Sequence, residues 1–403
     1  MFIGNYFQII FDLLTIILIL FRSFYSTTNL TALKPAYKYS NTILILFVIA
    51  LMYANLIGFR QKKSFDNIYI DNLRILSFSL ILIIPLLFFR LSNKILKILN
   101  TLFFIFTLIY TTFVFINILV SRNISEEDTS IFPGNLFSIS TLNLTLISYF
   151  CYYYLFRFIL KQNILDAIFI FISYLIILFT LQKWNIVCLV TIPIIFIKFV
   201  LFSKSVNKKV LNKIILLNTF IFILIFASVG STFIAQKAGF DDIGSFMDSR
   251  VLTKTDAANS NGLEQGVVGV NDSQAIKDGG RLLMWGDMVT RSFEHPFIGI
   301  GFGSRALEQF AFNIEDHNMI ITFMSRFGFP MTFIILYFLF KYIKSLYNIQ
   351  KVSNNLFKYI LLFCILNFFF QSIVGNIWGQ SFITINFSII LGLILSSIKL
   401  KSI

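Results

Sequence analysis

The sequence predicts an all-α polytopic membrane protein with about eleven transmembrane helices (ten to twelve) and one large external loop containing an amphipathic helix. Of the 403 residues, 57% are hydrophobic and only 13% are charged, which excludes an ordinary soluble domain. Long apolar runs, such as 98–120 and 214–234, contain no charged residue. A helix of that length crosses a hydrocarbon core of about 30 Å and satisfies its backbone hydrogen bonds internally.

The apolar runs follow one another with polar breaks between them. They predict spans near 5–22, 41–59, 73–90, 97–120, 136–160, 164–181, 185–202, 211–235, 318–344, 357–376 and 380–398. The first run lacks a charged n-region and a small-residue cleavage site, so an uncleaved span describes it better than a signal peptide. The chain thus divides into N-terminal membrane helices (1–235), a large external loop (236–316) and C-terminal membrane helices (317–403).

The net charge of +14 is distributed by topology. Lysines gather in short loops around Lys208 and Lys351, and the positive-inside rule places both loops and the C-terminus in the cytoplasm. The 236–316 loop then lies outside, and it holds twelve of the nineteen carboxylates. The basic charge therefore indicates contact with membrane lipids and not with nucleic acid.

One basic loop does not fit this topology. Arg60, Lys62, Lys63 and Arg74 flank a connection that strict alternation of the spans places outside. Either an early span is re-entrant or this loop is an exception to the positive-inside rule.

The end of the external loop has the clearest local pattern. Apolar residues at helical spacing predict an amphipathic helix over 281–293, suited to the membrane interface. His295-Pro296 ends it, because the residue before a proline is pushed out of the α region. Gly299, Gly301 and Gly303 then predict tight turns, and Asp316 or Asn313 is expected to cap the next span.

Two residues of this segment are the main candidates for chemistry. Arg281 can grip a phosphate bidentately, although an arginine on an interfacial helix can equally contact lipid headgroups. His317, at the entry to a span, can accept a proton from a sugar hydroxyl, and the alternative is a structural hydrogen bond. For His295 a helix-capping role is the stronger expectation.

Further residues complete the candidate site. The secondary candidates for substrate binding are Arg250, Arg291, Arg305, Arg326, Trp285 and Asn318. Arg326 lies well inside a predicted span, where an unpaired charge is costly. The histidines and carboxylates lack metal-ligand spacing, so neither a metal nor another cofactor is expected.

The order of these residues resembles the signature loop of the O-antigen polymerase and O-antigen ligase superfamily. The resemblance covers about fifty residues and rests on Gly280-Arg281, Trp285, Pro296, Gly299-x-Gly301, His317-Asn318 and Gly328. It implies an enzyme of the bacterial inner membrane that transfers glycans from a polyprenyl diphosphate on the external face, without a nucleotide sugar. By the same resemblance, Arg281 would hold the donor diphosphate and His317 would orient or deprotonate the acceptor hydroxyl.

The resemblance leaves several functions open. A polymerase joins lipid-linked repeat units, and the short chain with its unusual composition favours an enzyme matched to one repeat. A ligase would instead move the finished glycan onto lipid A core, and a related cell-wall glycan polymerase is a further alternative. A flippase for lipid-linked oligosaccharides would need charges deep in several spans. The expected partners are undecaprenyl-diphosphate-linked oligosaccharide, membrane lipids and, as a candidate protein, a chain-length regulator.

Overall fold

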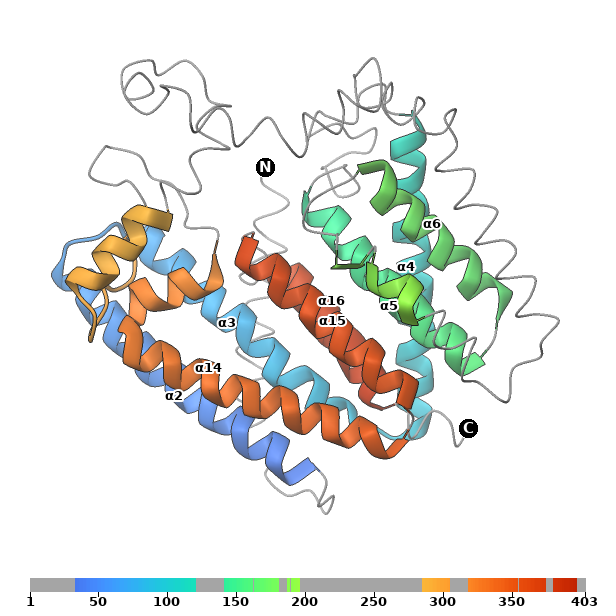
Figure 1. Ribbon diagram of the computed structural model, residues 1–403, viewed down its shortest axis with the longest axis horizontal. Coiled ribbons are helices and arrows are strands. Elements are labelled where there is room, and N and C mark those ends of the chain that lie inside the picture. Colours follow the sequence, from blue (N-terminus) through green and yellow to red (C-terminus); the bar gives the residue numbers. More distant parts are fainter. Residues whose placement is uncertain are drawn as a thin grey trace. The chain divides into compact units, whose positions relative to one another are not determined.

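The computed structural model describes residues 33–120, 141–161, 163–180, 187–188, 190–195, 285–304, 318–353, 355–374 and 380–396 (Figure 1). The elements within these ranges are helices joined by turns. The chain divides into two compact units, one formed by Met1–Leu102 with Leu283–Ile403 and the other by Phe103–Leu282. We describe each unit by itself.

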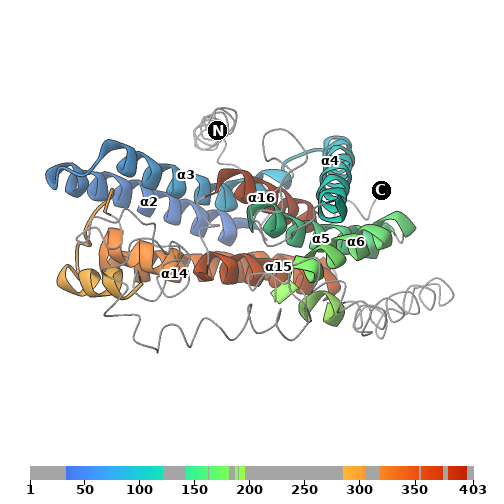
Figure 2. The same ribbon diagram turned by 90° about the horizontal axis from the view of Figure 1, so that it is seen from above.

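The first unit contains α2 (Lys34–Arg60), α3 (Phe65–Phe88), α14 (Met319–Ser353), α15 (Asn355–Val374) and α16 (Ser381–Leu395), with the start of α4 (Asn93–Val120). α2 and α3 form a hairpin joined by the turn 61–64. In Figure 2, α14 and α15 follow one row and α2, α3 and α16 follow another.

Aromatic packing fixes the centre of this unit. Phe47 of α2, Phe78 of α3 and Phe323 of α14 form a triangle of edge-to-face contacts with ring centroids 5.9–6.1 Å apart. Farther along, the hydroxyl of Tyr342 donates to the carbonyl of Ile81 at 3.0 Å. α14 therefore runs in the same direction as α3 and against α2. The turn 61–64 and the start of α14 lie at one end of the unit, which we call the loop end.

Within the part of the chain that the structure describes, four segments are long and apolar enough to cross a membrane: Lys34–Arg60, Phe65–Phe88, Asn93–Asn117 and Met319–Ile349. The same described ranges contain three shorter apolar helices: Ile164–Ile177, Phe357–Ile373 and Phe382–Leu395. The predicted class, a helical membrane protein, is confirmed at this level. The total of eleven spans stays a prediction, because 5–22, 211–235 and the loop up to residue 284 lie outside the described residues.

The second unit contains α4 from Phe103 onward, α5 (Thr141–Lys161) and α6 (Ile164–Thr180). α5 and α6 pack as a hairpin, and buried Arg157 donates to the carboxylate of Asp166 at 2.9 Å. The guanidinium of Arg157 also lies 3.5 Å from the ring centroid of Phe104. An ion pair and an aromatic face thus accommodate a cation inside an apolar helical layer.

Candidate functional site

α14 is interrupted about three turns after it begins. Gly328 has φ 76° and ψ 168°, which is not helical, and Pro330 follows two residues later. In a regular helix the N–H of Phe329 would bond to the carbonyl of Ser325. The kink separates these two groups, and Pro330 has no N–H for the carbonyl of Arg326. A span broken in this way needs new partners for its backbone, because hydrocarbon supplies none.

A loop that precedes α14 in the chain supplies these partners. We call residues 296–304 the glycine loop. The N–H of Ile300 donates to the freed carbonyl of Ser325 at 2.6 Å, and the N–H of Phe329 donates to the carbonyl of Pro296 at 2.8 Å. The loop is therefore docked into the kink by two backbone hydrogen bonds that replace the missing helical one.

Two glycines make this docking possible. A Cβ at Gly299 would lie 2.7 Å from the carbonyl carbon and oxygen of Arg326. A Cβ at Gly328 would lie 2.6 Å from the carbonyl carbon and oxygen of Phe297. Both glycines also have positive φ, which side chains disfavour. The backbones of the loop and the helix thus meet at a distance that only glycine allows.

The glycine loop also contacts the α2–α3 hairpin. The N–H of Phe302 donates to the carbonyl of Ala54 in α2 at 3.0 Å. The N–H of Gly303 donates to the carboxylate of Asp71 in α3 at 2.9 Å. Backbone contacts from one short loop therefore connect three membrane helices.

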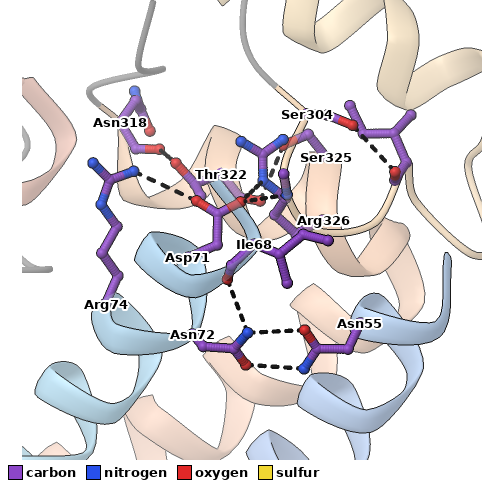
Figure 3. Close-up of polar contacts among 12 residues, drawn as sticks. Asn55, Ile68, Asp71, Asn72, Arg74, Ser304, Asn318, Thr322, Ser325 and Arg326 are labelled. Carbon is purple, nitrogen blue, oxygen red and sulfur yellow. Dashed lines mark hydrogen bonds and ion pairs between the residues drawn. The ribbon is translucent and has the colours of Figure 1, made fainter. Parts of the chain in front are cut away.

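Asp71 is the centre of a buried charge cluster at this point (Figure 3). Its Oδ2 accepts from Nε of Arg326 at 3.1 Å as well as from Gly303, and its Oδ1 lies 3.6 Å from Nη1 of Arg74. Asp71, Arg74 and Arg326 are 2%, 6% and 1% exposed. The carboxylate thereby stabilises Arg326, which sequence analysis placed deep in a span, and shares its charge with a second arginine.

The helix before the glycine loop occupies residues 285–294 within the described part of the chain. Met288 and Ile300 form a small buried cluster, and Trp285 and Ile321 pack against it. This helix is thereby fixed to both the glycine loop and the first turn of α14. The predicted helix end is confirmed, because the helical residues stop at 294 and His295 begins the turn.

The predicted site residues on this helix have different surroundings. Arg291 is partly buried and forms an ion pair with Asp287 at 3.6 Å. His295 is exposed, and its N–H donates to the carbonyl of Arg291 at 3.2 Å, as in the last turn of a helix. Phe293 is 67% exposed, and its ring lies 5.1 Å from that of Phe329.

Asn318 caps α14. Its side-chain oxygen accepts from the N–H groups of Ile320 at 3.0 Å and Ile321 at 3.1 Å. This corrects the expectation that Asp316 or Asn313 would be the cap. A helix start needs an acceptor two or three residues before the N–H groups it serves, and among the described residues Asn318 meets that geometry.

Four predicted site residues lie outside the described residues: Arg250, Arg281, Arg305 and His317. Two of them adjoin described anchors in the chain, since Arg281 is four residues before Trp285 and His317 directly precedes Asn318. The structure brings together Trp285, the glycine loop and the start of α14. Arg326 lies beside them, because Asp71 accepts hydrogen bonds from both Arg326 and Gly303 of the glycine loop.

Asp71 and Arg74 were not among the predicted site residues. Their signal in the sequence was present: a carboxylate and an arginine three residues apart, at the border between polar and apolar parts of a span. The apolar run in the sequence predicts a span that begins near residue 73, but α3 begins at Phe65. The polar residues of its first turns were taken for a loop, whereas Asp71 faces the interior.

No protein-family model matches the chain, and no curated protein matches it.

Proposed function

We propose that the protein is a polysaccharide polymerase of the O-antigen or capsular type, which joins polyprenyl-diphosphate-linked repeat units on the external face of the inner membrane. One observation carries the proposal: Trp285 and Ile321 pack on the same buried pair, Met288 and Ile300. Arg281 and His317 are each four residues from one of these two anchors. Four residues span at most about 14 Å, so each candidate is within that reach of its anchor, which supports the proposal that the two act at one site.

The glycine loop supports the same proposal. Pro296, Gly299 and Gly328, which belong to the resemblance, are the residues that dock the loop into the kink of α14. Asn318 fixes the helix start directly after His317. Some residues of the motif therefore hold the glycine loop and α14 together, and we assign the chemistry to Arg281 and His317 in the adjoining segments. Holding groups in place before the reaction is a main source of catalysis.

The proposed reaction is a single displacement. The acceptor hydroxyl oxygen attacks the anomeric carbon of the donor sugar while His317 takes the hydroxyl proton. The bond from that carbon to the diphosphate oxygen breaks, and the polyprenyl diphosphate leaves with the electron pair. Arg281 stabilises the charge on the leaving group through paired N–H donors. An in-line displacement inverts the anomeric configuration.

A reconstituted reaction tests this function. Purified protein in liposomes receives the lipid-linked repeat unit of its own cell, with no nucleotide sugar and with a chelator. The expected product is a ladder of longer lipid-linked glycans, together with free polyprenyl diphosphate. Addition of lipid A core as an acceptor distinguishes a ligase, which would transfer glycan to the core and leave the repeat unit unextended.

Topology is tested separately. Single cysteines at positions 208, 260 and 351, in a background without the native cysteines, are treated with an impermeant reagent in intact cells. The proposal expects labelling in place of Ser260 but not of Lys208 or Lys351. Labelling at 351 without labelling at 260 would reverse the orientation and move the reaction to the wrong face.

A lipid-linked oligosaccharide flippase is the second candidate, and one observation favours it. Within the described residues, five charged side chains are buried: Asp71, Arg74, Arg157, Asp166 and Arg326. Charges inside spans are typical of transport pathways. Their arrangement in two clusters with internal ion pairs fits a structural role equally well. Transfer of a lipid-linked repeat across liposomes without its extension would support the flippase.

A further inference from the structure

The α2–α3 turn places a basic surface beside the glycine loop. Arg60 and Lys62 are exposed, Lys63 is half-buried, and we call these three residues the basic turn. A Cβ at Gly303 would lie 2.8 Å from the Cβ of Lys63, and the carbonyl of Phe302 would lie 2.5 Å from a Cβ at Gly58. The turn and the loop are therefore in direct contact at the loop end of the first unit.

This contact locates the basic loop that does not fit the positive-inside rule. The sequence allows either a re-entrant span or an exception to the positive-inside rule at this position. The structure describes a helical hairpin, α2 and α3, whose turn lies at the same end as the glycine loop and the start of α14. If the proposed external reaction takes place at this end, the basic turn stands outside, where membrane topology alone does not favour cations.

Lys62 lies in the C-terminal cap of α2. It has φ +54° and is the one non-glycine residue with positive φ among the residues that the structure describes. The left-handed region costs an ordinary side chain about 1–2 kcal/mol, and glycine or asparagine is better suited to such a turn. The N–H groups of Lys62 and Lys63 donate to the carbonyls of Phe59 at 3.0 Å and Gly58 at 3.1 Å, so Lys62 occupies the left-handed position of a helix C-cap, where asparagine is also accepted.

The carboxylate nearest in sequence to the basic turn is exposed Asp66, in the first turn of α3. Among the described residues, neither Arg60 nor Lys62 forms an ion pair with it. Three cations on one turn, at the end of two apolar helices, match a compact anion carried at headgroup depth. A diphosphate on an isoprenoid chain has that chemistry.

We propose that the basic turn binds the diphosphate of a polyprenyl-linked substrate and guides it to the glycine-loop end of the first unit. This inference rests on the proposed function and names a second diphosphate contact besides Arg281. Because Arg60 and Lys62 are solvent-exposed, they meet the headgroup before it reaches the segments anchored by Trp285 and Ile321. The turn supplies affinity and orientation, and it touches no reacting atom.

Binding of undecaprenyl diphosphate to the full-length protein in nanodiscs of neutral phospholipid tests the proposal. The turn variant is Arg60→Gln with Lys62→Asn and Lys63→Gln. Each cation near a charged headgroup contributes about fivefold in affinity, so the variant should bind on the order of 100-fold more weakly. The matched control removes three exposed cations at the opposite ends of α2 and α14, with Lys34→Gln, Lys38→Gln and Lys344→Gln, and should bind as the wild type does.

Two further measurements separate the alternatives. Lys62→Asn alone should weaken binding about fivefold while the melting temperature stays the same or rises, because asparagine relieves the positive φ. If Lys62 had only a structural role, Lys62→Asn would lower the melting temperature and leave the binding of undecaprenyl diphosphate unchanged. Phosphatidylglycerol is the second probe, and its affinity should fall less in the turn variant than that of undecaprenyl diphosphate, because its headgroup carries a single negative charge.

The outcomes are distinct. Equal loss of both lipids would overturn the proposal in favour of a general contact with anionic phospholipid. Unchanged binding of undecaprenyl diphosphate by the turn variant would overturn it as well, and would leave the polymerase function standing if glycan synthesis persists. A wild-type protein that does not bind undecaprenyl diphosphate would contradict both the inference and the proposed function.

Discussion

Asp71→Asn should be the most damaging single change in the first unit. The wild-type carboxylate accepts from Gly303 and Arg326 through one oxygen and faces Arg74 through the other. The side chains of Asp71, Arg74 and Arg326 are each at least 94% buried. Asparagine keeps an acceptor for Gly303 but removes the charge that balances two arginines. Removal of one partner from a buried ion pair costs about 3–5 kcal/mol. The melting temperature in detergent should fall by roughly 5–10 °C.

Replacement of the arginines gives the matched comparison. Arg326→Gln should cost less than Asp71→Asn, because the carboxylate still has Arg74 nearby. Arg74→Gln should cost least, since its contact with Asp71 is longer, 3.6 Å against 3.1 Å. The double variant Asp71→Asn/Arg326→Gln should be more stable than the sum of the single changes, by about 0.5–3 kcal/mol.

A different order of these effects would contradict a cluster centred on Asp71 and Arg326. If Arg74→Gln lowers the melting temperature as much as Asp71→Asn does, the cluster is not centred on the pair that we describe. Additive single changes in the double variant would mean that Asp71 and Arg326 do not stabilise each other.

Three further predictions concern the glycine loop and the chemistry. Gly299→Ala should destabilise the protein and expose the loop to proteolysis, because the new Cβ meets the carbonyl of Arg326, whereas the control Gly286→Ala on the short helix meets nothing within 4 Å and should leave the melting temperature unchanged or higher. Arg281→Lys should lose most polymer synthesis at equal expression, since lysine keeps the charge but not the paired donors; near-normal glycan ladders would leave only a general electrostatic role. His317→Ala should reduce the rate by on the order of 10²–10⁴ while undecaprenyl diphosphate still binds, and exposed His295→Ala should be mild; the opposite pattern in complemented cells would assign the base to the other histidine.

Features that depend on composition or on neighbouring residues could be predicted from the sequence. Apolar runs located α2, α4 and α14, and His295-Pro296 located the end of the short helix, because both signals are local. The turn-forming role of Gly299 was also expected, and its positive φ confirms it.

Features that depend on distant partners could not be predicted. Asp71 and Arg326 are separated by 255 residues, so the chain alone does not indicate that they form a pair. The role of Gly328 as one half of a backbone contact with Phe297 depends on the same long-range arrangement. In the candidate site, the presence of Arg281 and His317 in one neighbourhood stays a prediction that their anchors support.

The charge cluster has a consequence for how the protein is made. Asp71 is synthesised 255 residues before Arg326, a delay on the order of tens of seconds at ribosomal speed. During that interval a lone carboxylate in a nascent membrane hairpin would oppose insertion. Arg74 lies one helical turn away in the same helix and is available as soon as α3 forms. It can therefore act as an interim counter-ion, and Asp71 acquires its closer partner only when the last third of the chain arrives.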